Sequence, residues 1–183
     1  MFARTPRLTL RPAWPEDAPA LTAAIADERV VRMLTRVPHP YALADAADWI
    51  AQPRGGHDPR FVIVAHDGGE PRLIGGIGIG IDDDEGAANL GYWLTPAAWG
   101  RGYATEAGRA VVDMARHALP IDRLEAWHFA DNPASGRVLR RLGFRPTGRT
   151  QAKRSVARPE AAPSIEYTLD LAEDGRAPMP IAA

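Results

Sequence analysis

Cysteine is absent from the 183-residue sequence, and lysine occurs once, as Lys153. Without thiols the chain has no disulfide framework, no thiolate nucleophile and no thiolate metal site. The phosphate loop that ends in Gly-Lys-Ser or Gly-Lys-Thr is also absent. The five histidines show neither the i, i+4 spacing nor the finger spacing of metal ligands, so we expect no metal site.

Long apolar runs and a large net charge are missing as well. No segment approaches the roughly 20 apolar residues that a membrane helix requires, and the polar residues 1–11 do not have the apolar centre of a secretory signal. The formal net charge of −1 favours neither nucleic acid nor a membrane surface as a partner. These absences predict a soluble, cytoplasmic protein.

Hydrophobic residues make up 45% of the sequence, which is enough for one core. We expect a single domain over residues 1–172 and a loose tail over 173–183, where proline, alanine and charge lack periodicity. Alternating hydrophobicity predicts strands, and helical spacing predicts helices. The strands are expected near residues 7–11, 61–66, 72–81, 90–94, 124–129, 144–149 and 165–171, and the longer helices near 15–28, 43–50, 102–117 and 133–142.

Residues 89–106 are the stretch around which the rest of the chain is organised. An apolar run at residues 90–94 has the length of a buried strand, and a turn containing Gly100 and Gly102 leads from it into a helix. The first amides of a helix have no intrahelical partner and carry partial positive charge, and glycine lets an anion approach the backbone closely. With Arg101 in the turn, this pattern indicates a seat for a diphosphate, although it is also typical of a plain connection.

The helix after this turn is followed by a further strand near residues 124–129. Strand, helix and strand in this order predict a parallel pair with a right-handed crossover. Asn132 then fits the cap of a short helix, with Pro133 at its first position and Gly143 after its end.

Several motifs together resemble those of the GNAT acetyltransferases. They are Trp99-Gly-Arg-Gly-Tyr-Ala-Thr-Glu-Ala107, Asp131-Asn-Pro-Ala-Ser135 and Leu142-Gly-Phe144, and they are most similar to the branch that acetylates the N-termini of ribosomal proteins. The resemblance implies an α/β (α+β) fold with a mixed, mostly antiparallel sheet of about seven strands, splayed at its centre and flanked by helices. It also implies that acetyl-CoA lies in the splayed gap, with its pantetheine arm along residues 90–94.

The resemblance also implies which residues contact the cofactor. Gly102 and Ala104 match two fixed places of the family's phosphate motif, whereas Trp99 stands where its first polar residue is expected. The Thr105 hydroxyl is expected either to reach the diphosphate or to bond back along its helix. The full set of expected cofactor-binding residues is Tyr92, Trp93, Leu94, Arg101, Gly102, Tyr103, Ala104, Thr105, Asn132, Ser135 and Arg137.

Acetyl transfer requires a neutral amine to attack the thioester carbonyl, and the leaving thiolate needs a proton. The resemblance implies that Ser135 supplies this proton and that Asn132 holds the pantetheine or a bridging water. The alternative is that both are simply residues at a helix start.

A general base is harder to find in the sequence. Relatives often have a glutamate at the start of the central strand, where this chain has Asn89, and an amide cannot accept the proton. Glu106, Glu125 and the acidic residues 82–85 remain candidates, each also explained as a solvated or structural acid. Without a base, a peptide N-terminus or small amine of lower pKa is favoured over lysine.

Four aromatic residues are candidates for an acceptor pocket, with core packing as the alternative. They are Trp14, Tyr41, Trp49 and Trp93. The favoured function is an acetyl-CoA-dependent N-acetyltransferase that acts on a protein N-terminus or a small-molecule amine. A non-catalytic acetyl-CoA-binding sensor and a structural or interaction protein are the alternatives, and apolar strand edges leave a homodimer open.

Overall fold

The computed structural model describes residues 1–53, 55, 59–81 and 86–172. Residues 54 and 56–58, the acidic residues 82–85 and the tail at 173–183 lie outside the described residues. The elements in chain order are β1 (Ala3–Arg4), β2 (Leu8–Arg11), η1 (Pro15–Asp17), α1 (Ala18–Ile25), α2 (Glu28–Val31), α3 (Leu43–Ala51), β3 (Arg60–Ala65), β4 (Arg72–Ile81), β5 (Ala88–Leu94), η2 (Pro96–Ala98), α4 (Tyr103–Ala118), β6 (Arg123–Phe129), α5 (Pro133–Arg141), β7 (Arg145–Lys153) and β8 (Ala162–Asp170).

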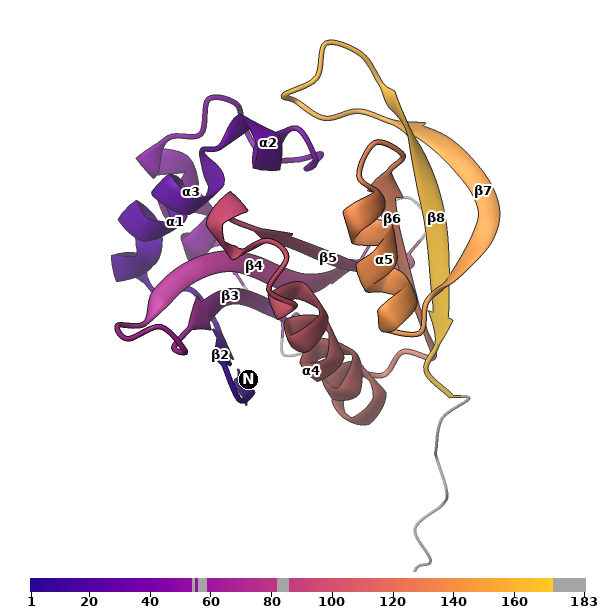
Figure 1. Ribbon diagram of the computed structural model, residues 1–183, viewed down its shortest axis with the longest axis horizontal. Helices are drawn as coiled ribbons and strands as arrows, with labels where there is room; N and C mark the ends of the chain where they lie inside the picture. Colours follow the sequence, from indigo (N-terminus) through magenta and orange to yellow (C-terminus); the bar gives the residue numbers. More distant parts are fainter. Residues whose placement is uncertain (54, 56–58, 82–85, 173–183) are drawn as a thin grey trace, which may run out of the picture.

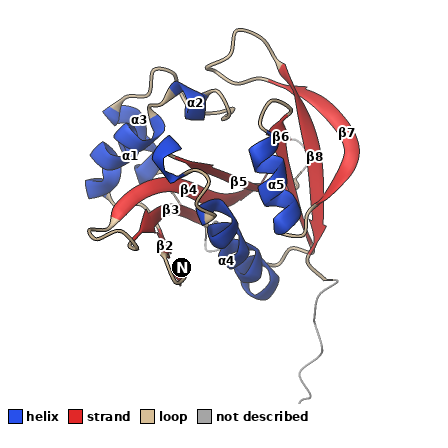
Figure 2. Cartoon of the chain, in the orientation of Figure 1, coloured by secondary structure: helices blue, strands red, loops and turns tan. Residues whose placement is uncertain are grey.

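The strands form one eight-stranded sheet in the order β1-β2-β3-β4-β5-β6-β8-β7 (Figures 1 and 2). All neighbours are antiparallel except β5 and β6, whose parallel pairing confirms the prediction from the strand-helix-strand order. The sheet therefore has the mixed, mostly antiparallel character that was expected. It has one strand more than the expected seven, because the two residues of β1 are too few to show an alternating pattern in the sequence.

Helices cover both faces of the sheet, and the alternation of side chains along β5 shows how they are divided. Leu90 and Leu94 join a core that includes Val111 of α4 and Leu139 of α5. Trp93 points to the opposite face, where it packs with residues of α1 and α3. Helices of the described part of the chain are all too short or too polar to cross a membrane.

The glycine-rich β4 is a strand, as predicted, and it makes room for a large side chain. A Cβ added to Gly76 would lie 2.7 Å from the indole nitrogen of Trp93 on the neighbouring strand. Because real contacts are not this short, glycine is required at this position for the indole to pack directly on the sheet.

Candidate active site

The sheet opens between β5 and β6. β5 pairs with β4 at seven positions, and β6 pairs with β8 at seven positions. In contrast, β5 and β6 share a single described pair, Asn89 with Glu125. Beyond this pair, residues 90–93 have no strand partner on the β6 side within the described ranges. Their backbone groups on that edge are placed to bond an extended ligand, as one strand bonds another.

The turn before α4 lies at the open end of β5. Gly100 and Gly102 have positive φ angles of 74° and 81°, which other residues rarely adopt. No side chain caps the helix at Gly102, and the amide of Glu106 makes the first helical bond to the Gly102 carbonyl, at 3.0 Å. The amides of residues 103–105 therefore lie unpaired by the helix at the positive end of its dipole. This geometry suits an anion.

The side chains around this turn differ in what they offer a ligand. Arg101 is exposed. Thr105 is buried, and its hydroxyl has no hydrogen-bond partner among the described residues, so it does not bond back along the helix. Trp99 donates its indole N–H to the Leu94 carbonyl at 2.8 Å, so it closes the turn where the family motif expects a polar residue.

An ion pair fixes the start of α4 to the start of β2. Arg7 Nη2 lies 2.6 Å from Glu106 Oε2, and Glu106 also accepts a hydrogen bond from the Thr5 hydroxyl at 2.6 Å. Burial raises the pKa of the Glu106 carboxyl, but the hydrogen bonds from Thr5 and Arg7 and the Arg7 charge outweigh it, so this pKa lies below its ordinary value. Glu106 is thus a structural acid that holds the start of α4, and not a free carboxylate available as the general base.

Tyr103, next in this cluster, is 2% exposed, and its hydroxyl donates to the Asp67 carboxylate at 2.8 Å. The Arg7 guanidinium lies 4.7 Å from the centre of its ring. Because the side chain is enclosed in this way, Tyr103 offers a ligand its backbone amide and not its phenol.

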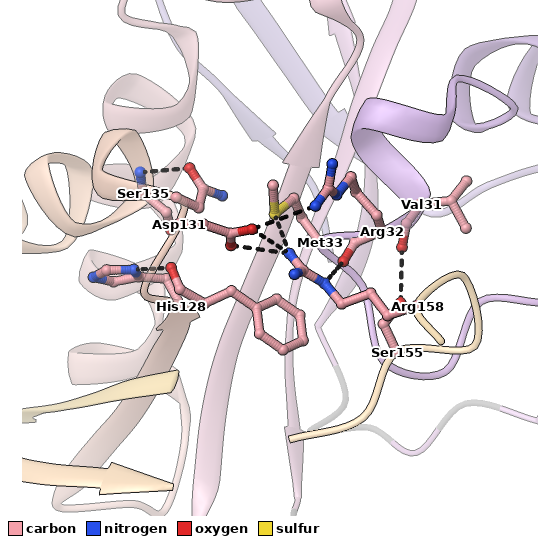
Figure 3. Close-up of polar contacts among 10 residues, drawn as sticks. Val31, Arg32, Met33, His128, Asp131, Ser135, Ser155 and Arg158 are labelled. Atoms are coloured by element: carbon pink, nitrogen blue, oxygen red, sulfur yellow. Dashed lines mark hydrogen bonds and ion pairs between the residues drawn. The ribbon is translucent and has the colours of Figure 1, made fainter. Parts of the chain in front are cut away.

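The start of α5 lies across the opening from β5. Asn132 Oδ1 accepts a hydrogen bond from the Ser135 amide at 3.3 Å, which confirms the predicted cap (Figure 3). Ser135 Oγ lies 2.7 Å from Tyr92 Oη, and either oxygen can be the donor; Tyr92 also donates to the Ser135 carbonyl at 3.1 Å. Since Tyr92 belongs to β5 and Ser135 to the helix after β6, this pair spans the opening.

The Tyr92 phenol is protonated at neutral pH. Burial raises the pKa of Tyr92 to about 12, although the hydrogen bond with Ser135 acts in the opposite direction. Tyr92 can therefore donate a proton but cannot act as a base. The sequence placed Tyr92 among the cofactor contacts and gave no signal for its bond to Ser135, which lies 43 positions away.

The sequence pattern of the acetyltransferase (GNAT) domain matches residues 7–145 of this chain. The chain belongs to the GNAT acetyltransferase family. A relative, the uncharacterized N-acetyltransferase p20 of Bacillus licheniformis, is 32% identical over 149 residues, which cover 79% of this chain and 82% of p20. The protein is accordingly an acyltransferase.

Solved structures show the same GNAT fold at lower sequence identity. The ribosomal-protein-S5-alanine acetyltransferase of Vibrio fischeri has a TM-score of 0.79 and 19% identity, with 94% of this chain and 98% of that chain covered. The ribosomal alpha-N-protein acetyltransferase RimL, solved in complex with coenzyme A, has a TM-score of 0.78 and 20% identity, with 93% and 98% covered.

On the face opposite α4 and α5, this GNAT enzyme has a cavity of about 300 Å³. Three of the four predicted aromatic residues, Tyr41, Trp49 and Trp93, line it together with Asp45 and Asp48. The same rings pack on the small core of α1 and α3, so they are part of both the pocket and the core. Burial, and then the Asp45 charge, raise the pKa of Tyr41.

Trp14 and Arg137 lie apart from these groups. Trp14 is 49% exposed and stacks on the Arg11 guanidinium, at 3.9 Å from the ring centre, and it does not line the pocket. Arg137 is exposed on α5. Among the described residues, no three histidine, aspartate or glutamate side chains come together as metal ligands would.

The structure leaves fewer candidates for the general base of the acetyltransferase. Asn89 donates its side-chain amide to the Ala87 carbonyl at 3.3 Å and carries no carboxylate. Glu106 is held by Arg7, and residues 82–85 lie outside the described ranges. Glu125 is half-buried and paired in register with Asn89, so the two side chains share one face of the sheet. Trp93 of the pocket is on that same face.

Proposed function

We propose that this GNAT enzyme transfers the acetyl group of acetyl-CoA to a primary amine by direct attack in a ternary complex. The observation that carries the proposal is the opening between β5 and β6, with the α4 amides at its rim and the Tyr92–Ser135 pair across it. An extended pantetheine arm fits the unpaired edge of β5. The amides of residues 103–105, with Arg101, suit a diphosphate. The coenzyme A bound to RimL supports this choice of cofactor.

Tyr92 and Ser135 are placed for the proton that the leaving sulfur needs. The amine nitrogen attacks the carbonyl carbon, the C–N bond forms, and the C–S bond breaks with its electrons on sulfur. The Ser135 hydroxyl protonates the thiolate, and the Tyr92 hydroxyl at 2.7 Å returns a proton to Ser135. The Tyr92 phenolate regains its proton from solvent, and the proton lost by the amine goes to the general base. Asn132 contributes by holding the start of α5 and by presenting its amide to the pantetheine.

The acceptor in this proposal is a protein N-terminal α-amine or a small-molecule amine. Glu125 is the candidate to receive the proton of the amine, because its carboxylate lies next to Asn89, on the face of the sheet that also carries the pocket. A half-buried carboxylate removes protons most readily from amines of low pKa, and an α-amine has a pKa of about 8 against about 10.4 for lysine. The pocket supplies aromatic surface for the acceptor and the Asp45 and Asp48 carboxylates at its rim.

Release of coenzyme A, detected with a thiol reagent, tests the proposal. The protein has no cysteine, so it contributes no background signal. We expect release with a peptide carrying a free α-amine, and at pH 7.5 at least about 10-fold faster release than with the same peptide blocked at its N-terminus and carrying a lysine. Absence of release with every peptide and small amine, despite binding of acetyl-CoA, would refute transfer and leave a binding role.

A further inference from the structure

The connection between β7 and β8, residues 154–161, reaches to the end of α2 in the other half of the molecule (Figures 1 and 3). Arg158 Nη2 donates to both carboxylate oxygens of Asp131, at 2.9 Å and 3.0 Å, and its Nε donates to the Arg32 carbonyl at 2.8 Å. The guanidinium lies 4.3 Å from the centre of the Phe129 ring. One side chain thus joins the end of α2, the turn after β6 and the β7–β8 connection.

These contacts, which we call the Arg158 latch, are sheltered from solvent on the arginine side. The Arg158 side chain is 9% exposed. Its hydrogen bond lowers the pKa of Asp131 against the effect of burial, and the charges of Arg158 and Arg32 lower it further. Ser155, 5% exposed, adds a hydrogen bond from its hydroxyl to the Val31 carbonyl at 3.3 Å. A two-oxygen contact with a sheltered guanidinium fixes geometry better than an exposed ion pair does.

The Arg158 latch connects the two parts of the proposed active site. Asp131 directly precedes Asn132, whose side chain caps the helix that carries Ser135. On the other side, Arg32 leads within a few residues into the segment of Arg36, Val37, Pro38 and Tyr41 that lines the pocket. The start of α4, where the diphosphate seat is proposed, makes none of the contacts of the latch.

We propose that Arg158 is a positioning residue that holds the wall of the acceptor pocket in a fixed place relative to Ser135. The proposal rests on the proposed function, because it concerns the alignment of an acceptor with the acetyl group. Without the Arg158 latch, the contact between residues 32–41 and the start of α5 is reduced to the longer ion pair of Arg32 with Asp131, at 3.5 Å. Misalignment of reacting groups by about 1 Å lowers a rate by up to about 100-fold.

The test compares Arg158→Met with Arg154→Met. Methionine keeps an apolar stem over Phe129 but removes every donor, and Arg154 is an exposed arginine of the same connection. We expect Arg158→Met to raise the KM of the acceptor and lower kcat, with a combined loss of about 10-fold to 100-fold, while the KM of acetyl-CoA changes less than the KM of the acceptor. Arg154→Met should behave as the wild type. Asp131→Asn should also lower the rate, and the double variant should lose less than the two single losses combined, because both changes weaken the contact between Arg158 and Asp131.

Hydrogen exchange provides a readout that needs no turnover. In Arg158→Met, amides of residues 29–36 and 130–137 should exchange faster, and those of residues 103–111 should not change. If residues 29–36 and 130–137 exchanged at the same rate in Arg158→Met as in the wild type, the positioning role would be overturned. An increase of the same size over the whole sheet would overturn it as well. A wild-type protein that transfers to no amine would refute the proposed function instead, and the exchange comparison would still decide whether the Arg158 latch holds the two segments together.

Discussion

Replacing Gly102 with alanine separates the cost of backbone strain from the cost to ligand binding. Gly102 has a φ of 81°, and the atom nearest to an added Cβ, Arg7 Nη2, would lie 3.6 Å away. This distance is an ordinary contact, so the methyl group meets no obstacle within the protein. The loss of stability then comes from the left-handed backbone, at about 1–2 kcal/mol, which lowers the Tm of a protein of this size by roughly 2–8 °C.

Gly148 in β7 offers a control with the same φ angle. Its φ is also 81°, and nothing lies within 4 Å of its added Cβ. Gly148→Ala should therefore lose a similar amount of stability, far from the start of α4. Acetyl-CoA at about 100 times its Kd adds about 2.7 kcal/mol to the wild type. If the methyl group at position 102 weakens binding 10-fold, the same ligand concentration adds only about 1.4 kcal/mol.

Melting curves of the three proteins with and without acetyl-CoA measure both effects. We expect both variants to melt below the wild type without ligand, and only Gly102→Ala to lose part of the rise in Tm that acetyl-CoA produces. ATP and NAD serve as ligands that should give no rise. A full ligand shift in Gly102→Ala would refute the diphosphate seat and leave the start of α4 as an ordinary turn.

Two titrating residues give further predictions. Between pH 10.0 and about pH 12, the wild type should lose roughly 2–3 kcal/mol of unfolding free energy, and Tyr92→Phe should not. In this range the phenol is ionised in the unfolded state but still protonated in the folded state, so rising pH favours unfolding. Denaturant unfolding across this pH range checks it, and parallel pH profiles would contradict the burial of a protonated Tyr92. Glu106→Gln should cost about 1–3 kcal/mol at pH 7 through the loss of its ion pair. Since the pKa of Glu106 is lowered, this difference should disappear as the pH falls below 4.5; a difference that persists in acid would mean that packing, not charge, holds the start of α4.

Features that depend on neighbouring residues could be predicted from the sequence. The cap of α5 follows from Asn132 and Pro133, which are adjacent in the chain, and its hydrogen bond forms within three residues. The start of α4 follows from Gly100 and Gly102, both with positive φ. The parallel strands follow from the order of elements around the long helix. Each of these signals is local, so no tertiary packing is needed to find it.

Features that depend on the divergence of β5 and β6 could not be predicted. The Tyr92–Ser135 bond and the Arg158–Arg32 hydrogen bond join positions 43 and 126 residues apart, and each connects one half of the divided sheet to the other. The placement of the aromatic residues could not be predicted from the sequence either. Composition marked four candidates, and only packing decides that Trp14 stacks on Arg11 while the other three line the pocket.

Acetyl transfer by Ser135→Ala, followed by mass spectrometry of an acceptor peptide, tests directly whether the Ser135 hydroxyl protonates the leaving thiolate. Alanine keeps the Asn132 cap, because the donor there is the backbone amide of residue 135. We expect a fall in kcat of about 100-fold or more, with the acetyl-CoA shift in Tm equal to that of the wild type. Undiminished transfer by Ser135→Ala would refute the role of Ser135 and place the chemistry elsewhere in the opening.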